Sequence, residues 1–96
     1  MIKAWHERAW EEYIYWQTQD KKTLRRINSL INDIERNGYS CIGGPEPLKH
    51  ELSGWWSAEI DNKNRLIFKI SDSDEPETVD ILSCKGHYIQ PGISKQ

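Results

Sequence analysis

The chain has 96 residues, of which 36% are hydrophobic and 29% are charged, and its formal net charge at pH 7 is −2. This length supports one domain, and this composition is typical of a soluble globular protein. The apolar runs fall short of the ~20 residues that a membrane span needs, and the N-terminus MIKAWHERAW is charged where a secretory signal is apolar, so we expect a cytoplasmic protein without membrane contact.

The charges are unevenly distributed along the chain. Residues 71 to 80, SDSDEPETVD, hold five acidic residues and no basic one, whereas residues 20 to 36 hold five basic residues against three acidic ones. A near-neutral total argues against strong independent binding to nucleic acid, but it leaves room for a local basic face. If the protein acts on RNA, we therefore expect another partner to contribute part of the binding affinity.

Cys41 and Cys84 are far apart and belong to no metal-ligand spacing. The sequence therefore predicts neither a disulfide framework nor a metal site, and it suggests no cofactor.

The N-terminal residues predict a strand and a first helix. Residues 1 to 5, MIKAW, alternate as a short strand does. Between residues 7 and 19, apolar side chains recur at helical spacing. The predicted apolar stripe of this helix is Trp10, Tyr13, Ile14 and Trp16.

A second helix is predicted directly after the first. Asp20 is a favourable N-cap, and Asn37-Gly38 is a typical helix end. Between them runs an apolar stripe of Leu24, Ile27, Leu30, Ile31 and Ile34. Because almost nothing separates the two helices, we expect an antiparallel helical hairpin.

After residue 38 the apolar pattern changes to a period of two residues. Segments 54 to 60, 65 to 71 and 78 to 84 predict three strands, and their short connections predict antiparallel neighbours. The chain thus predicts an α+β domain of order β-α-α-β-β-β, with two helices packed on one face of an antiparallel sheet. We assign residues 1 to 88 to this single domain and residues 89 to 96 to a C-terminal tail.

Glu46, Arg65 and His87 are candidates for acid–base chemistry on RNA. Cleavage without a metal needs a base for the 2′-hydroxyl proton, a cation for the charge on phosphorus, and an acid for the leaving 5′-oxygen. Glutamate, arginine and histidine suit these three roles in that order. Each residue also has an ordinary interpretation: a solvated turn carboxylate, a surface cation and a satisfied terminal histidine.

Two further residues have a similarly open interpretation. Lys49 lies on an exposed turn after Pro47, where a solvated charge is common. Tyr88 could stack on a base or pack at a sheet edge. By themselves, composition and spacing predict a small α+β domain with a candidate acid–base site and no more specific function.

Several segments carry a resemblance to a known family. They are AW at 4 to 5, AWEEYIYW at 9 to 16, INSLINDI at 27 to 34, PEPLKHELSGWWS at 45 to 57, NRLIFKI at 64 to 70, and HY at 87 to 88. In these segments the chain resembles the YoeB/Txe branch of the RelE-like toxins of bacterial toxin–antitoxin pairs. The resemblance implies a microbial-ribonuclease-like fold.

The resemblance also implies an activity and partners. Members are ribosome-dependent endoribonucleases that cut mRNA in the ribosomal A site without a cofactor. A cognate antitoxin of the YefM/Axe type inhibits them, operator DNA is bound only through the antitoxin complex, and a homodimer is also implied.

Residue by residue, the resemblance assigns roles at five positions. It implies that Glu46 is the general base, His87 the general acid and Arg65 the cation that stabilises the phosphorane. It further implies that Tyr88 positions the RNA and that Lys49 faces the RNA backbone.

The sequence departs from the family pattern at Ala58 and Glu59, where a basic pair is usual, and in the residues that follow Tyr88. We expect the loss of two cations and the added carboxylate to weaken contact with RNA. The alternative is a catalytically weakened or inactive protein of the same fold that only binds an antitoxin or another target.

Overall fold

The computed structural model describes residues 1–71 and 77–87. Most of the predicted acidic turn and the whole predicted tail lie outside these residues. The helices are α1 (Glu7–Gln19), α2 (Lys21–Asn37) and the short 3-10 turns η1 (Gly38–Ser40) and η2 (His50–Leu52). The strands are β1 (Ile2–Trp5), β2 (Glu46–Pro47), β3 (Trp56–Glu59), β4 (Arg65–Ser71) and β5 (Thr78–Ser83). Within the described ranges, no helix is long and apolar enough to cross a bilayer.

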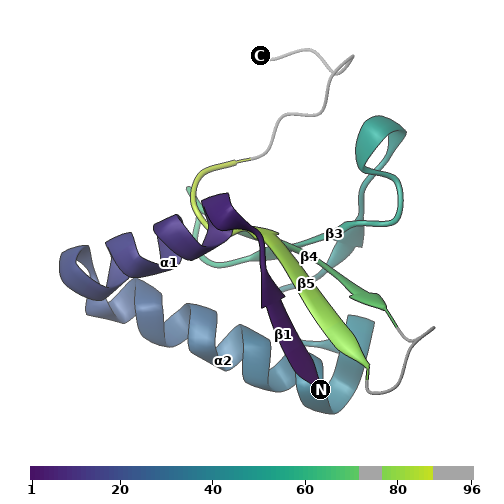
Figure 1. Cartoon of the computed structure of the whole chain (residues 1–96), viewed down its shortest axis with the longest axis horizontal. Helices are drawn as coiled ribbons and strands as arrows, with labels where there is room; N and C mark the ends of the chain where they lie inside the picture. The colour runs from purple at the N-terminus through teal and green to yellow at the C-terminus, as the bar shows by residue number, and fades with distance from the viewer. Residues whose placement is uncertain (72–76, 88–96) are drawn as a thin grey trace.

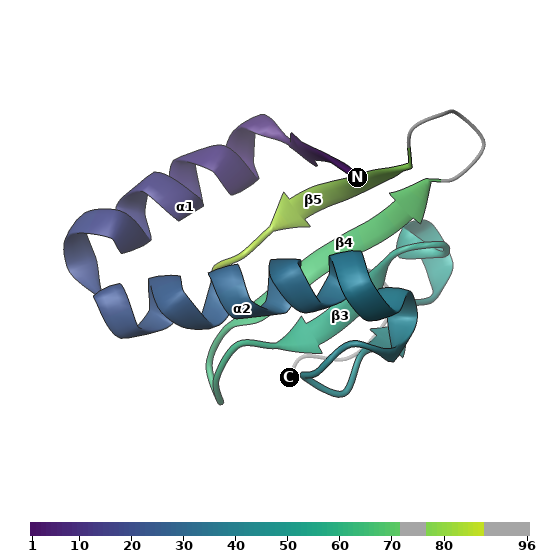
Figure 2. The same ribbon diagram turned by 90° about the horizontal axis from the view of Figure 1, so that it is seen from below.

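The five strands form one sheet in the order β1-β5-β4-β3-β2. Both long helices cover the same face of this sheet, and Figure 2 shows α2 running across it in front of β4. The predicted α+β class and helix placement are confirmed. The sheet is mixed rather than wholly antiparallel as predicted, because β1 pairs with β5 in parallel. The sequence also failed to indicate β2, which has only two residues.

The junction between α1 and α2 follows from the capping chemistry of Asp20. Its side chain accepts hydrogen bonds from the backbone N–H groups of Lys22 and Thr23, which are orphan donors of the first helical turn. At the other end, the N–H of Gly38 is bonded to the carbonyl of Ile34, and its φ of 58° suits glycine. The helix limits predicted from these residues are confirmed.

The contribution of Asp20 to stability should depend on pH. Its hydrogen bonds with the side chain and the backbone of Thr23 hold the pKa of the Asp20 carboxyl below its ordinary value of 3.8. A lowered folded-state pKa stabilises the fold above the ordinary value, and this contribution disappears as the pH falls through the folded value. We expect Asp20→Ala to lower the urea midpoint clearly at pH 7 and much less at pH 2. Equal losses at the two pH values, or an Asp20→Asn variant as unstable as Asp20→Ala, would contradict this explanation.

The hydrophobic core lies between the helices and the sheet. It includes Ile27, Leu30, Ile31 and Ile34 of α2, packed against Ala58, Leu66, Phe68, Val79 and Ile81 of the sheet. The predicted stripe of α2 is confirmed.

The predicted stripe of α1 was wrong in part. Ala9 and Trp16 are the buried residues of α1, whereas Trp10 and Ile14 are 46% and 45% exposed. The two buried residues are seven positions apart, so they share one helix face. Glu12 also contacts the sheet side, through the backbone of Cys84, although hydropathy alone would place a carboxylate in solvent.

Candidate functional site

The face of the sheet opposite the helices, here called the site face, carries the first candidate residue. Glu46 on β2 lies opposite Ser57 on β3, and Ser57 lies opposite Ile67 on β4. Side chains at paired positions project from the same face of a sheet. Ile67 is buried but does not belong to the core between the helices and the sheet. The row from Glu46 to Ile67 therefore crosses the site face.

Arg65 leans toward this row from the first position of β4. Its Nε donates a hydrogen bond to the Ser57 hydroxyl over 2.9 Å, and a terminal nitrogen lies 3.4 Å from the Ser57 carbonyl oxygen. The side chain of Ser57 thus holds the guanidinium beside the strand pair that carries Glu46. Glu46 is exposed and Arg65 is half-buried, so solvent reaches both side chains.

His87 is connected to Arg65 through the preceding residue. The backbone N–H of Arg65 donates to the carbonyl of Gly86 over 3.1 Å, which places the residue before His87 beside the start of β4. The exposed His87 ring has Nε2 3.1 Å from the carbonyl oxygen of Asn62. A carbonyl oxygen only accepts, so Nε2 carries the hydrogen in this arrangement.

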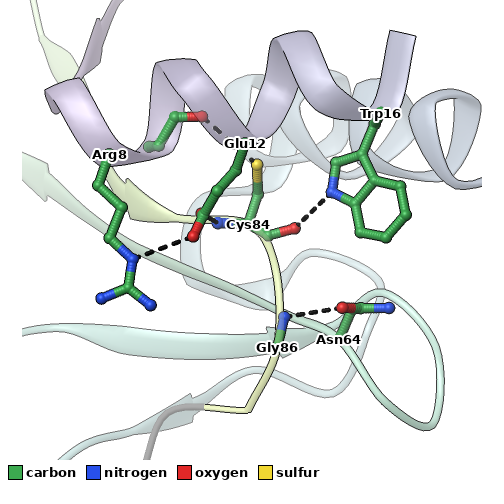
Figure 3. Close-up of polar contacts among 7 residues, drawn as sticks. Arg8, Glu12, Trp16, Asn64, Cys84 and Gly86 are labelled. Carbon is green, nitrogen blue, oxygen red and sulfur yellow. Dashed lines mark hydrogen bonds and ion pairs between the residues drawn. The ribbon is translucent and has the colours of Figure 1, made fainter. Parts of the chain in front are cut away.

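The segment that leads to His87 is fixed by side chains from outside the sheet (Figure 3). Glu12 accepts from the N–H of Cys84 over 2.7 Å, and Trp16 Nε1 donates to the Cys84 carbonyl over 2.9 Å. Asn64 Oδ1 accepts from the N–H of Gly86 over 2.7 Å. The backbone is thus held on both sides of Lys85 after β5 has ended.

The thiol of Cys84 is a structural contact rather than a nucleophile. Burial, and then the charge of Glu12, raise the pKa of this thiol to about 12. It therefore stays protonated at neutral pH, and its Sγ lies 3.7 Å from the carbonyl oxygen of Ala9.

Lys49 lies in the loop that carries η2, and its side chain is exposed. Figure 1 shows this loop projecting from the sheet on the side away from α2. The loop returns to the sheet at Trp55, whose ring centroid is 4.7 Å from the Lys69 ammonium and 5.6 Å from the His6 ring. A cavity of about 350 Å³ lies between the loop, α1 and β5; it is lined by His6, Glu7, Arg8, Leu52, Leu82 and Ser83.

The two departures from the family pattern have different structural consequences. Ala58 is fully buried in the core and does not lie on the site face, and the expected effect of the missing basic pair on RNA contact stays a prediction. Glu59 is exposed and is the register partner of Arg65, so its carboxylate projects from the site face. Tyr88 lies outside the described residues.

Reasoning from the sequence missed the residues that support the candidates. Ser57, Asn64 and Glu12 contact Arg65, Gly86 and Cys84 through pairings that are 8, 22 and 72 residues apart in the chain. For Ser57, alternation along β3 could have provided a signal, because its neighbours Trp56 and Ala58 face the core and this polar residue therefore points to the opposite face. For Glu12, spacing from Ala9 and Trp16 could have indicated the buried helix face.

The site face carries an exposed carboxylate and a guanidinium held by a serine, and the exposed imidazole of His87 follows the residue that is bonded to the N–H of Arg65. Such a set can accept a proton, bind an anionic group and donate a proton. The sheet and the two helices that cover it have the fold of the RelE-like toxins. A solved YoeB/ParE toxin from Agrobacterium tumefaciens superposes with a TM-score of 0.87 and 32% sequence identity, covering 92% of this chain and 100% of that one.

The sequence comparisons identify the family within this class. The model of the YoeB-like toxin of bacterial type II toxin-antitoxin systems matches residues 5–88. The toxin YoeB of Escherichia coli K12 is 42% identical over 88 residues, which are 92% of this chain and 100% of that protein. A YoeB dimer from Staphylococcus aureus has 38% identity and a TM-score of 0.82, with coverage of 92% and 98%. This chain belongs to the YoeB-like toxin family.

Proposed function

We propose that this toxin is a ribosome-dependent endoribonuclease that cuts mRNA in the A site without a metal ion. The observation that carries the proposal is the placement of Arg65. Its guanidinium is held on Ser57, which is the register partner of Glu46, and its backbone N–H is bonded to the residue before His87. These contacts favour convergence of the three groups on one phosphodiester.

The proposed reaction is an internal transesterification. Glu46 removes the proton of the 2′-hydroxyl, and the 2′-oxygen attacks the adjacent phosphorus. Arg65 stabilises the charge on the phosphorane, since a guanidinium offers a planar set of donors to phosphate oxygens. The bond from phosphorus to the 5′-oxygen breaks while His87 donates a proton to that oxygen. The products are a 2′,3′-cyclic phosphate and a 5′-hydroxyl.

Lys49 and Tyr88 complete the proposed site. The exposed position of Lys49 on the η2 loop supports a contact with the RNA backbone. For Tyr88 we propose a role in positioning the RNA, which rests on family membership.

Dependence on the ribosome is supported by the charge of the protein. A net charge of −2 provides little attraction for free RNA, so binding must come from a surface that the ribosome supplies. We therefore propose that the toxin acts in the cytoplasm on translated messages.

The proposed protein partner is an antitoxin of the YefM/Axe type. Support comes from the YoeB-YefM complex of Staphylococcus aureus, whose toxin has 37% identity to this chain. We propose that operator DNA is bound only through such a complex. The YoeB dimer of the same organism supports a homodimer.

A second candidate function is antitoxin binding with weakened or absent cleavage, and Glu59 favours it. Its carboxylate shares the site face with Arg65 and opposes a phosphate there. If the toxin does cleave, we expect Glu59→Gln to accelerate cleavage about two- to fivefold, the effect of removing one exposed like charge near a phosphate. Cleavage on programmed ribosomes measures the change, and Glu51→Gln serves as a control on the η2 loop. A slower Glu59→Gln variant would show that the carboxylate assists the reaction.

The proposed function is tested by primer extension on a message held in translating ribosomes. Added toxin should produce a cut within the A-site codon, and the same message free in solution should remain intact. Intact mRNA on the ribosome, together with tight binding to the antitoxin, would establish the second candidate function instead.

A further inference from the structure

We propose that Glu12 is a positioning residue for His87. The proposal rests on the proposed function, because it assigns to α1 the task of holding the segment that carries the general acid. The observation is the set of hydrogen bonds in Figure 3 around Cys84 and Gly86.

Regular strand pairing does not continue into this segment, because β5 ends at Ser83. The four backbone polar groups of Cys84 and Gly86 are nevertheless all paired. Three of them bond to the side chains of Glu12, Trp16 and Asn64, and the fourth bonds to the N–H of Arg65. His87 follows directly, so its Cα has little freedom relative to the guanidinium of Arg65.

Glu12 is the charged member of this set, and it accepts from the N–H of Cys84, the first residue after β5. Its side chain is 12% exposed, and its second carboxylate oxygen pairs with Arg8 Nε over 3.0 Å. Because little water reaches this side chain, a variant that lacks the acceptor leaves the N–H of Cys84 without a replacement partner. Arg8 is 73% exposed, which makes the ion pair separable from the bond to Cys84.

Three variants separate the hydrogen bond from the charge. Glu12→Ala removes the acceptor, Glu12→Gln keeps an acceptor oxygen without the charge, and Arg8→Ala keeps the carboxylate without its ion pair. In single-turnover cleavage on saturating ribosomes, we expect Glu12→Ala to be about 10²-fold slower, because a displacement near 1 Å has this effect on a reacting group. Glu12→Gln and Arg8→Ala should stay within about threefold of the wild type. The ribosome concentration that gives half-maximal rate should not change in any of the three.

A second background shows whether the effect passes through His87. In a His87→Ala protein the acid is already absent, so adding Glu12→Ala should slow cleavage by no more than about twofold. An equal slowing in both backgrounds, or an undiminished rate in Glu12→Ala alone, would overturn the proposal.

Amide hydrogen exchange provides a readout that does not need cleavage. We expect the Gly86 amide to exchange at least about tenfold faster in Glu12→Ala and at the wild-type rate in Arg8→Ala. Asn64, which accepts the hydrogen bond of this amide, is intact in both variants. If Glu12→Ala does not fold, Trp16→Phe keeps an aromatic side chain, removes the donor to Cys84, and carries the same expectations. Unchanged Gly86 exchange overturns the positioning role, whereas a wild-type protein that leaves ribosome-bound mRNA intact overturns the proposed function.

Discussion

Glu46→Gln should slow cleavage of ribosome-bound mRNA by about 10²- to 10⁴-fold, which is the usual contribution of a general base. The substitution preserves the size of the side chain and the pairing of β2 with β3, since that pairing uses the backbone. What it removes is the ability to accept the 2′-hydroxyl proton. Initial rates at saturating ribosome concentration measure the effect.

The matched control is Glu51→Gln, which removes the same charge from an exposed residue of η2. We expect its rate to remain within about twofold of the wild type, as for surface substitutions away from a reacting group. If the two variants lost activity equally, net charge rather than proton abstraction would explain the role of Glu46.

Phe68→Ala should destabilise the fold by about 3–5 kcal/mol, the cost of replacing a large buried aromatic residue by alanine. Phe68 is fully buried at the centre of β4, and its ring centroid lies 5.8 Å from that of Tyr39. The loss is a large part of the ~5–15 kcal/mol that stabilises most domains. Phe68 and Arg65 belong to the same strand, β4. We therefore expect the variant to lose cleavage activity over the same urea range in which it unfolds.

Urea unfolding followed by tryptophan fluorescence measures this change, and Ile14→Ala is the control. Ile14 is 45% exposed, so its truncation should cost less than about 1 kcal/mol. If Phe68→Ala lowered the free energy of unfolding by less than about 1 kcal/mol, the assignment of Phe68 to the core would be contradicted.

Local patterns were enough to predict the regular elements of this fold. The apolar period of α2, the cap at Asp20 and the alternation along β5 are encoded in neighbouring residues, and the structure confirms them. The pairing of β1 with β5 joins residues about 76 positions apart, such as Ile2 and Thr78, so no local signal could specify it. The strand β2 escaped prediction because two residues, one of them a proline, form no period.

For the candidate site, the sequence predicts the residue types but not their arrangement in space. Glutamate, arginine and histidine suggest acid–base chemistry, but their spacing along the chain does not place them on one face. The register of β2, β3 and β4 places Glu46 and Arg65 on one face, and the bond between the Arg65 N–H and the Gly86 carbonyl brings the residue before His87 to the start of β4. Supporting contacts such as Glu12 to Cys84 need the complete packing of α1 on the sheet.

Identification of the RNA ends produced on translating ribosomes tests the central claim most directly. If Glu46, Arg65 and His87 act on one phosphodiester, the wild type should leave a 2′,3′-cyclic phosphate and a 5′-hydroxyl at a cut within the A-site codon. The variants Glu46→Gln, Arg65→Ala and His87→Ala should each lose this product. A 3′-hydroxyl with a 5′-phosphate, or full cleavage by any of the three variants, would contradict the proposed mechanism.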